Sequence, residues 1–160
     1  MRLLVPTIAL LFWTVPVAAQ DLIYSDAHTA NCAAGAELPA GLEGCIGLSS
    51  TRCQDDNGYA TVVMSGCLSL ETEWWDKRLN IAYQEALNKA REMDAENGEY
   101  APSQAEAIRD MQRAWIPFRD ATCSYEASQW GGGTGQGPAY VACLLQMTAD
   151  QVIYLEQAGL

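Results

Sequence analysis

The sequence has 160 residues, enough for one domain with a buried core, and nine Lys and Arg against 20 Asp and Glu give a net charge of −11. This charge argues against a nucleic-acid partner, because phosphate binding depends on lysine and arginine. Strong negative charge keeps a protein soluble and speeds its encounter with cationic partners. An acidic surface that serves solubility alone is the alternative.

The first residues have the pattern of an export signal. Arg2 precedes a mostly apolar stretch over residues 3–17, and small residues lead up to Ala19. We therefore expect residues 1–19 to be a cleaved signal peptide. A membrane anchor needs roughly 20 apolar residues, and this stretch is shorter and interrupted by prolines. With no cysteine at the cut for a lipid, the pattern predicts a periplasmic or secreted protein free of the membrane, with a net charge of −12 from eight basic and 20 acidic residues.

Cysteine number and spacing predict disulfides and no metal. The six cysteines are Cys32, Cys45, Cys53, Cys67, Cys123 and Cys143. An even number in an exported chain indicates three disulfides. Zinc sites need close ligand pairs such as C-x-x-C, which are missing here, and His28 is the single histidine. Residues 54–58 (QDDNG) lack the alternating ligands of a calcium loop and are typical of a turn. We expect no cofactor.

The pattern predicts an irregular segment followed by three helices. Residues 20–52 show no sustained period, apart from a possible short helix over 42–52, and residues 58–63 are the one candidate strand. Apolar residues then recur at three- and four-residue steps over 67–96, 103–130 and 138–156. The expected inner faces comprise Trp75, Leu79, Ala82, Tyr83, Ala86, Ala90 and Met93; then Ile108, Met111, Trp115, Phe118, Thr122 and Tyr125; then Val141, Ala142, Leu145, Val152 and Leu155.

The lengths of the three expected helices predict an all-α fold. Ser103 and Glu106 have the spacing of a capping box that opens the second helix. Two long helices joined by a tight connection pack antiparallel, and the third folds back over them. We therefore expect a small disulfide-braced three-helix bundle, an antiparallel helix hairpin plus a C-terminal helix, with an irregular N-terminal segment.

No pattern indicates a catalytic centre. The glycine run 131–137 follows a helix, and no lysine or arginine lies beyond Arg119, so a flexible connection is favoured over a phosphate loop. Glycosidase chemistry needs two acids held across a cleft, and a compact bundle offers little cleft. Disulfide pairing would also consume every thiolate that could act as a nucleophile.

Several segments, taken in order, resemble the LprI-like lysozyme inhibitor family. The resemblance is carried by Cys53 and Cys67, residues 75–83 (WDKRLNIAY), residues 112–123 (QRAWIPFRDATC), the glycine run and residues 143–148 (CLLQMT). It covers roughly Cys53 to Leu155, and it departs from the family at Gln151, where arginine is usual. Cys32 and Cys45 lie outside this part and resemble a subgroup. The resemblance implies an exported helical domain over 53–158 and, as activity, lysozyme inhibition.

The resemblance also guides the disulfide pairing. If the family-like part folds alone, its four cysteines pair among themselves. We expect the pairs Cys53–Cys67 and Cys123–Cys143, which leaves Cys32–Cys45. The motif residues are interpreted as structural, with the polar ones fixing the register between helices: Trp75, Asp76, Leu79, Asn80, Tyr83, Gln112, Trp115 and Arg119.

The functional hypotheses come from three classes. The first is an inhibitor of lysozyme-type muramidases, which are often basic and would attract an acidic protein. The second is a non-enzymatic structural or stress-related envelope protein, and the third is a small enzyme acting on cell-wall sugars. For a partner surface, the expected residues are Trp130, Gly131, Gly132 and Gly133, because tryptophan is enriched in binding hot spots. Trp130 as a cap on the core is the alternative. The sequence does not indicate the oligomeric state.

Overall fold

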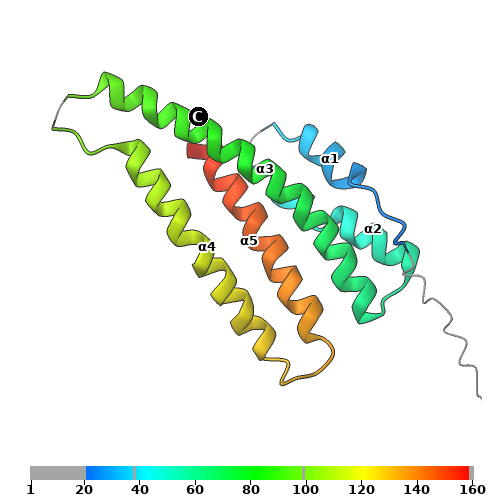
Figure 1. Ribbon diagram of the computed structural model, residues 1–160. Helices are drawn as coiled ribbons and strands as arrows, with labels where there is room; N and C mark the ends of the chain where they lie inside the picture. Colours follow the sequence, from blue (N-terminus) through cyan, green and yellow to red (C-terminus); the bar gives the residue numbers. More distant parts are fainter. Residues whose placement is uncertain (1–20, 38, 99, 159–160) are drawn as a thin grey trace, which may run out of the picture.

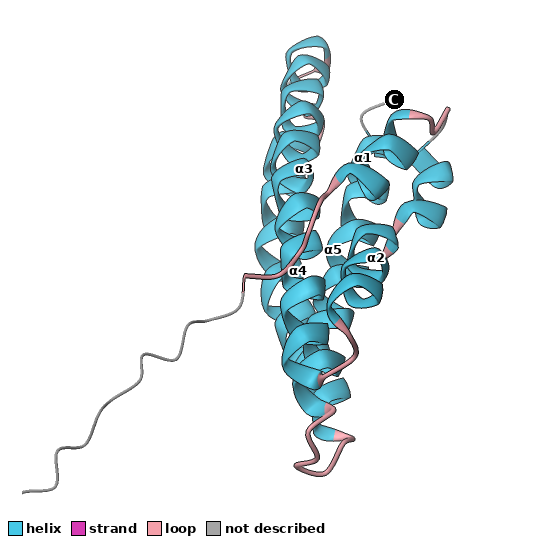
Figure 2. Cartoon of the chain, turned by 90° about the vertical axis from the view of Figure 1, so that its right-hand side faces the viewer, coloured by secondary structure: helices cyan, strands magenta, loops and turns pink. Residues whose placement is uncertain are grey.

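The computed structural model describes residues 21–37, 39–98 and 100–158, and this part of the chain consists of helices, turns and loops (Figures 1 and 2). The predicted all-α class is therefore confirmed. The predicted signal peptide lies outside the described residues.

Three long helices form the body of the molecule: α3 (Thr61–Glu96), α4 (Gln104–Ser128) and α5 (Gln136–Ala158). α3 and α4 run in opposite directions, and α5 turns back beside α3, with which it shares the largest helix–helix interface (Figure 1). The loop between α4 and α5 lies at the far end of the molecule from the loop between α3 and α4. We call the end that carries the α4–α5 loop the glycine-loop end. It is formed by residues 129–135, the end of α4 and the starts of α3 and α5.

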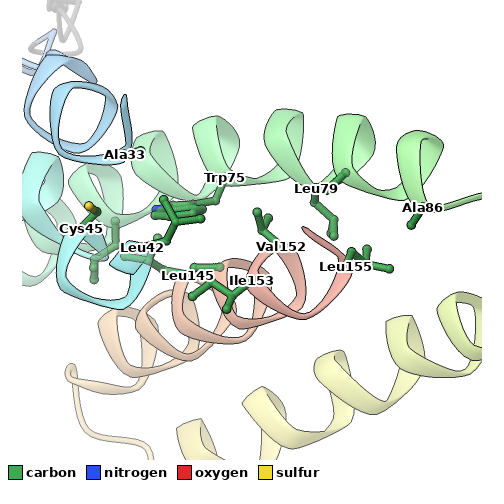
Figure 3. Packing of buried hydrophobic residues seen from close by; sticks show 13 residues of the cluster. Ala33, Leu42, Cys45, Trp75, Leu79, Ala86, Leu145, Val152, Ile153 and Leu155 are labelled. Atoms are coloured by element: carbon green, nitrogen blue, oxygen red, sulfur yellow. The ribbon is translucent and has the colours of Figure 1, made fainter. Parts of the chain in front are cut away.

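The main core lies between α3 and α5 (Figure 3). Trp75 of α3 is fully buried there, and Val152 and Leu155 of α5 are equally inaccessible to water. Each large apolar side chain removed from water contributes about 1.5–3 kcal/mol, so this interface is the principal source of stability. A second, smaller cluster of Leu87, Ala90 and Ala105 connects α3 to α4.

The N-terminal segment is more ordered than predicted. It contains α1 (Ala27–Ala34), the 3-10 helix η1 (Pro39–Cys45) and α2 (Leu48–Asn57), where an irregular segment with one short helix over 42–52 was expected. Such short helices are marginal alone, and tertiary contacts stabilise them. α2 packs on α3, and η1 packs on α5 and inserts the fully buried Leu42 into the core (Figure 3).

A buried carboxylate attaches this segment to α3. Glu71 is fully buried and accepts hydrogen bonds from the backbone N–H groups of Gly47 (2.8 Å) and Ser50 (2.6 Å). The Thr29 hydroxyl (2.8 Å) and the indole N–H of Trp75 (3.2 Å) also donate to it. Among the described residues no lysine or arginine pairs with Glu71, so these four donors replace the water that a buried carboxylate loses.

The predicted turn and strand before α3 are also corrected. Residues 54–57 form the end of α2, and the break comes at Gly58, which has a φ of +89°. Residues 61–63 belong to α3 and not to a strand. Val62 is 78% exposed, so the apolar residues at 62–63 do not form the half-buried face that a strand would need.

The inner face of α4 agrees with the prediction only in part. Ile108, Met111 and Trp115 of the expected stripe are partly buried and pack against the core. Phe118 and Tyr125 are 62% and 68% exposed. The buried positions of α4 are Ala105, Cys123 and Ala127, so small residues complete the contact where the stripe leaves it. In α5, Ala142 was also expected inside and is exposed.

Three disulfides brace the helices. They join Cys32 to Cys45, Cys53 to Cys67 and Cys123 to Cys143, which are the pairs expected from the resemblance. The first closes α1 onto η1, the second ties α2 to α3, and the third ties α4 to α5.

The start of α4 has two caps. The Ser103 hydroxyl accepts from the backbone N–H of Glu106 (3.2 Å), which is one of the two bonds of the predicted capping box. Among the hydrogen bonds of the described residues, the return bond from the Ser103 N–H to the Glu106 carboxylate is not found. The Asp94 carboxylate of α3 accepts from the backbone N–H groups of Ala105 (3.0 Å) and Gln104 (2.7 Å) and from the Ser103 hydroxyl (2.7 Å). These bonds, that of Ala105 first, hold the pKa of Asp94 below its ordinary value of 3.8.

Candidate functional site

The predicted motif residues of α3 divide into buried and exposed groups. Trp75 and Leu79 are in the core, and Tyr83 is partly buried beside them. Asp76 and Asn80 are exposed, and Asn80 Nδ2 donates to the Asp76 carbonyl oxygen (2.9 Å) within the same helix. The expectation that these two polar residues fix the register between helices was therefore wrong.

The motif residues of α4 do contact another helix. Gln112 Oε1 accepts a 3.0 Å hydrogen bond from Nε2 of Gln151, the position where the sequence departs from the family pattern. Arg119 reaches the hydroxyl of the buried Thr148 (3.4 Å), and its guanidinium lies 5.0 Å from the ring centroid of Trp115. Gln112 and Arg119 therefore make side-chain contacts between α4 and α5.

Trp130 lies at the surface of the glycine-loop end, directly after α4. Its side chain is 56% exposed, and one side of the ring rests on Gly135. A Cβ atom at position 135 would lie 2.3 Å from Cε3 of Trp130, so only glycine leaves room for the ring. Gly131 and Gly132 have φ values of +57° and +82°, a backbone conformation that glycine adopts without strain. Gly131 and Gly132 therefore form the turn after α4, and Gly135 leaves the space against which the Trp130 ring packs.

Trp130 separates two grooves. The first, which we call the disulfide groove, has a volume of about 670 Å³, lies between α4 and α5 and includes Tyr125, Glu126 and Cys143 in its walls. The second, which we call the apolar groove, has a volume of about 410 Å³ and lies between Trp130, the start of α5 and the start of α3, where Met64 forms part of it. Because Trp130 lines both grooves, its exposed part can be contacted by a partner that enters either of them.

The glycine-loop end lacks positive charge. The sequence contains no lysine, arginine or histidine over residues 53–76 or after Arg119. The two nearest arginines in the sequence have internal partners, since Arg52 pairs with Asp56 (2.7 Å) and Arg119 with Asp120 (2.8 Å). This end therefore presents aromatic, amide and carboxylate groups.

Two further properties bear on the chemistry. Within the described ranges, no group of three or more His, Cys, Asp or Glu side chains is placed to hold a metal ion. In the same part of the chain, no helix is long and apolar enough to cross a membrane.

Comparison with known proteins decides the family. The family described as "Lysozyme inhibitor LprI" matches residues 53–155, more than half of the chain. The chain belongs to the LprI lysozyme inhibitor family. The resemblance found in the sequence is confirmed, and the family is one of inhibitors, not of enzymes.

Two relatives are themselves uncharacterized. An "Uncharacterized 17.7 kDa protein in puhA 5'region" of Rhodobacter capsulatus is 30% identical over 137 residues, which are 82% of this chain and 85% of the relative. An uncharacterized protein of Rhizobium meliloti (strain 1021) is 28% identical over 85 residues, 51% of this chain and 61% of the relative. No solved structure matches the chain.

The LprI match includes the whole glycine-loop end and excludes α1 and η1. Both grooves therefore lie in the part that belongs to the LprI family. Three disulfides in this chain fit a protein exported to an oxidising compartment.

The partner surface expected from the sequence named Trp130 but not the residues beside it. Tyr125 was assigned to the core, and Glu126 was not singled out, yet both line the disulfide groove beside Trp130. Glu126 and Trp130 are four residues apart, the spacing that places side chains on one face at a helix end. That spacing, with the absence of basic residues after Arg119, was the available signal.

Proposed function

We propose that the protein is an exported, non-catalytic binding protein that inhibits lysozyme-type muramidases in the periplasm. The LprI family match over residues 53–155 carries this proposal, because lysozyme inhibition is the property named in the family description. The charge of the chain supports it, since an acidic protein meets a basic enzyme with electrostatic help. A disulfide-braced helical bundle also provides a rigid surface, which lowers the cost of binding.

Inhibition can be tested directly. The chain from Asp21 onward, purified with its disulfides intact, is added to a basic c-type lysozyme, and clearing of a cell-wall suspension is followed by turbidity. We expect dose-dependent inhibition and a 1:1 complex by calorimetry, both weaker at high salt, because salt screens attraction between the two proteins. The same protein incubated with cell-wall fragments alone should release no products.

Two results would contradict the proposal. No binding and no inhibition even at low salt would favour the alternative role, a non-enzymatic structural or stress-related envelope protein. Release of cell-wall fragments by the protein alone would instead indicate an enzyme.

A further inference from the structure

We propose that the glycine-loop end is the surface that holds the muramidase, and that its disulfide groove receives a lysine or arginine side chain of that enzyme. This inference rests on the proposed function and adds the binding surface and the chemistry of the contact. It commits to a cationic protein as the occupant of this surface.

The side chains of the disulfide groove suit a cation. The exposed rings of Tyr125 and Trp130 form parts of its wall, and the exposed Glu126 carboxylate lies in the same wall. Aromatic faces attract ammonium and guanidinium groups, and a carboxylate adds a charge-assisted hydrogen bond. The amide oxygens of Gln129 and Gln146 supply further acceptors.

In the described part of the chain, the other tryptophans either lie next to an arginine or are buried. Arg78 lies over the Trp74 ring at 5.9 Å from the centroid, and Arg119 lies over the Trp115 ring at 5.0 Å. Trp75 is fully buried. Among the residues that the structure describes, no arginine or lysine covers Trp130, so its exposed face is available to a cation from another protein.

Charge complementarity selects the partner. Residues 53–76 and 120–160 contain acidic residues and no basic ones, and the glycine-loop end is built largely from these two stretches. A cationic protein is steered to such an end, whereas an anionic one is repelled. The partner would insert its lysine or arginine into the disulfide groove. An aliphatic side chain next to that residue in the partner could then be buried in the apolar groove on the other side of Trp130.

The surface is also held in place before binding. Cys143 lies in the wall of the disulfide groove, and its bond to Cys123 fixes α4 against α5 there. The absence of a side chain at Gly135 lets the Trp130 ring pack against the loop. A site ordered in advance loses less conformational entropy when a partner binds.

The experiment compares paired variants in binding to a basic c-type lysozyme. Trp130→Ala should weaken binding by roughly tenfold or more, as expected for an interface tryptophan. Glu126→Gln should weaken it by roughly threefold to tenfold and reduce its dependence on salt, because a charge is removed without a change of shape. The controls are at the other end of the molecule: Tyr100→Ala, at a side chain 96% exposed, and Glu106→Gln, at an exposed carboxylate of α4. Both controls should bind like the unchanged protein.

The outcomes separate this inference from the proposed function. If lysozyme binds but all four variants bind equally, the surface is wrong and the inhibitor role stands. For the case in which lysozyme does not bind, a blocked Gly-Arg-Gly peptide is titrated while the indole N–H signal of Trp130 is followed by NMR. A shift that disappears in Glu126→Gln supports a cation site with another basic partner and removes lysozyme as that partner. No shift and no lysozyme binding overturn both proposals.

Discussion

Two glutamate–tryptophan pairs with the same spacing have opposite environments in this molecule. Glu71 and Trp75 are four residues apart in α3, fully buried, and joined by a 3.2 Å hydrogen bond. Glu126 and Trp130 are also four residues apart, but both are exposed and line a groove at the glycine-loop end. The first pair holds the fold together, and we propose that the second binds a partner.

The difference comes from what lies opposite each pair. Glu71 faces backbone N–H groups of the N-terminal segment, at Gly47 and Ser50, which satisfy its carboxylate in the absence of water. Within the described part of the chain, no hydrogen bond or ion pair from elsewhere in the protein reaches the Glu126 carboxylate. A carboxylate without an internal partner stays in water, where it remains available to a ligand. The two pairs therefore have the same spacing in the sequence. Their different environments come from the parts of the fold that lie opposite them.

The largest expected loss of stability comes from a substitution of Glu71. Glu71→Ala removes the acceptor for four buried donors and leaves a small cavity, and unpaired buried polar groups cost about 1–3 kcal/mol each. We expect a loss of about 3–5 kcal/mol in the free energy of unfolding, measured by urea denaturation.

Glu73 is the matched control for this change. Glu73 lies two residues further along α3 and is exposed, so Glu73→Ala should change the free energy of unfolding by no more than about 0.5 kcal/mol. Equal losses for the two variants would show that loss of charge or of helix propensity, and not the buried network, explains the effect.

The disulfide between α1 and η1 should have the next largest effect. Replacing both Cys32 and Cys45 by serine opens a closure of 13 residues, which is worth about 3 kcal/mol in the chain-entropy model. Amide hydrogen exchange should speed up first in α1 and η1. Without this disulfide they are held by the Glu71 network, by two hydrogen bonds between Thr29 and Ser49, and by the contacts of Ala33 and Leu42 with the core. Uniform acceleration over all helices would mean that this segment and the bundle unfold as one unit.

The sequence predicted the long helices because amphipathic periodicity is a local property. The second helix, expected over 103–130, is observed at Gln104–Ser128 with its serine cap. The faces were only partly predictable. Ile108, Met111 and Trp115 pack against the core as expected, whereas Phe118 and Tyr125 follow the same helical step and are exposed, and Ala127 is buried. Side-chain size misled the assignment, because the shape of the neighbouring helix determines which face fits.

The N-terminal elements and the grooves could not be predicted for a different reason. The positions of α1 and α2 depend on Glu71, whose sequence neighbours give no sign that it is buried. The grooves depend on the distance between α4 and α5, which packing and the Cys123–Cys143 bond set. Trp130 drew attention in the sequence because it precedes a glycine run, and the structure shows that its side chain is exposed.

A smaller effect is expected at the cap formed by Asp94. Its pKa is lowered in the folded state, chiefly by the Ala105 N–H, so the folded protein binds this proton less readily than the unfolded chain. The stabilisation is therefore present above the unfolded pKa and is lost as the pH falls through the lower, folded pKa. Asp94→Asn should remove this part of the acid sensitivity, seen as amide exchange at Gln104 and Ala105 that no longer accelerates with acid after correction for intrinsic rates. Unchanged acid sensitivity at these two amides would assign it to other carboxylates.

The smallest effect on stability is expected at Trp130, and it tests the comparison most directly. More than half of this side chain is already in water, so Trp130→Ala should cost about 1 kcal/mol or less in the free energy of unfolding. Trp75→Ala, at the fully buried member of the other pair, should cost about 3–5 kcal/mol in the same urea titration. If the two losses were equal, Trp130 would be a part of the core that closes the end of α4, and the glycine-loop end would lose its anchor for a partner. If Trp130→Ala folds with nearly unchanged stability, any loss of lysozyme binding in this variant reports on the contact itself.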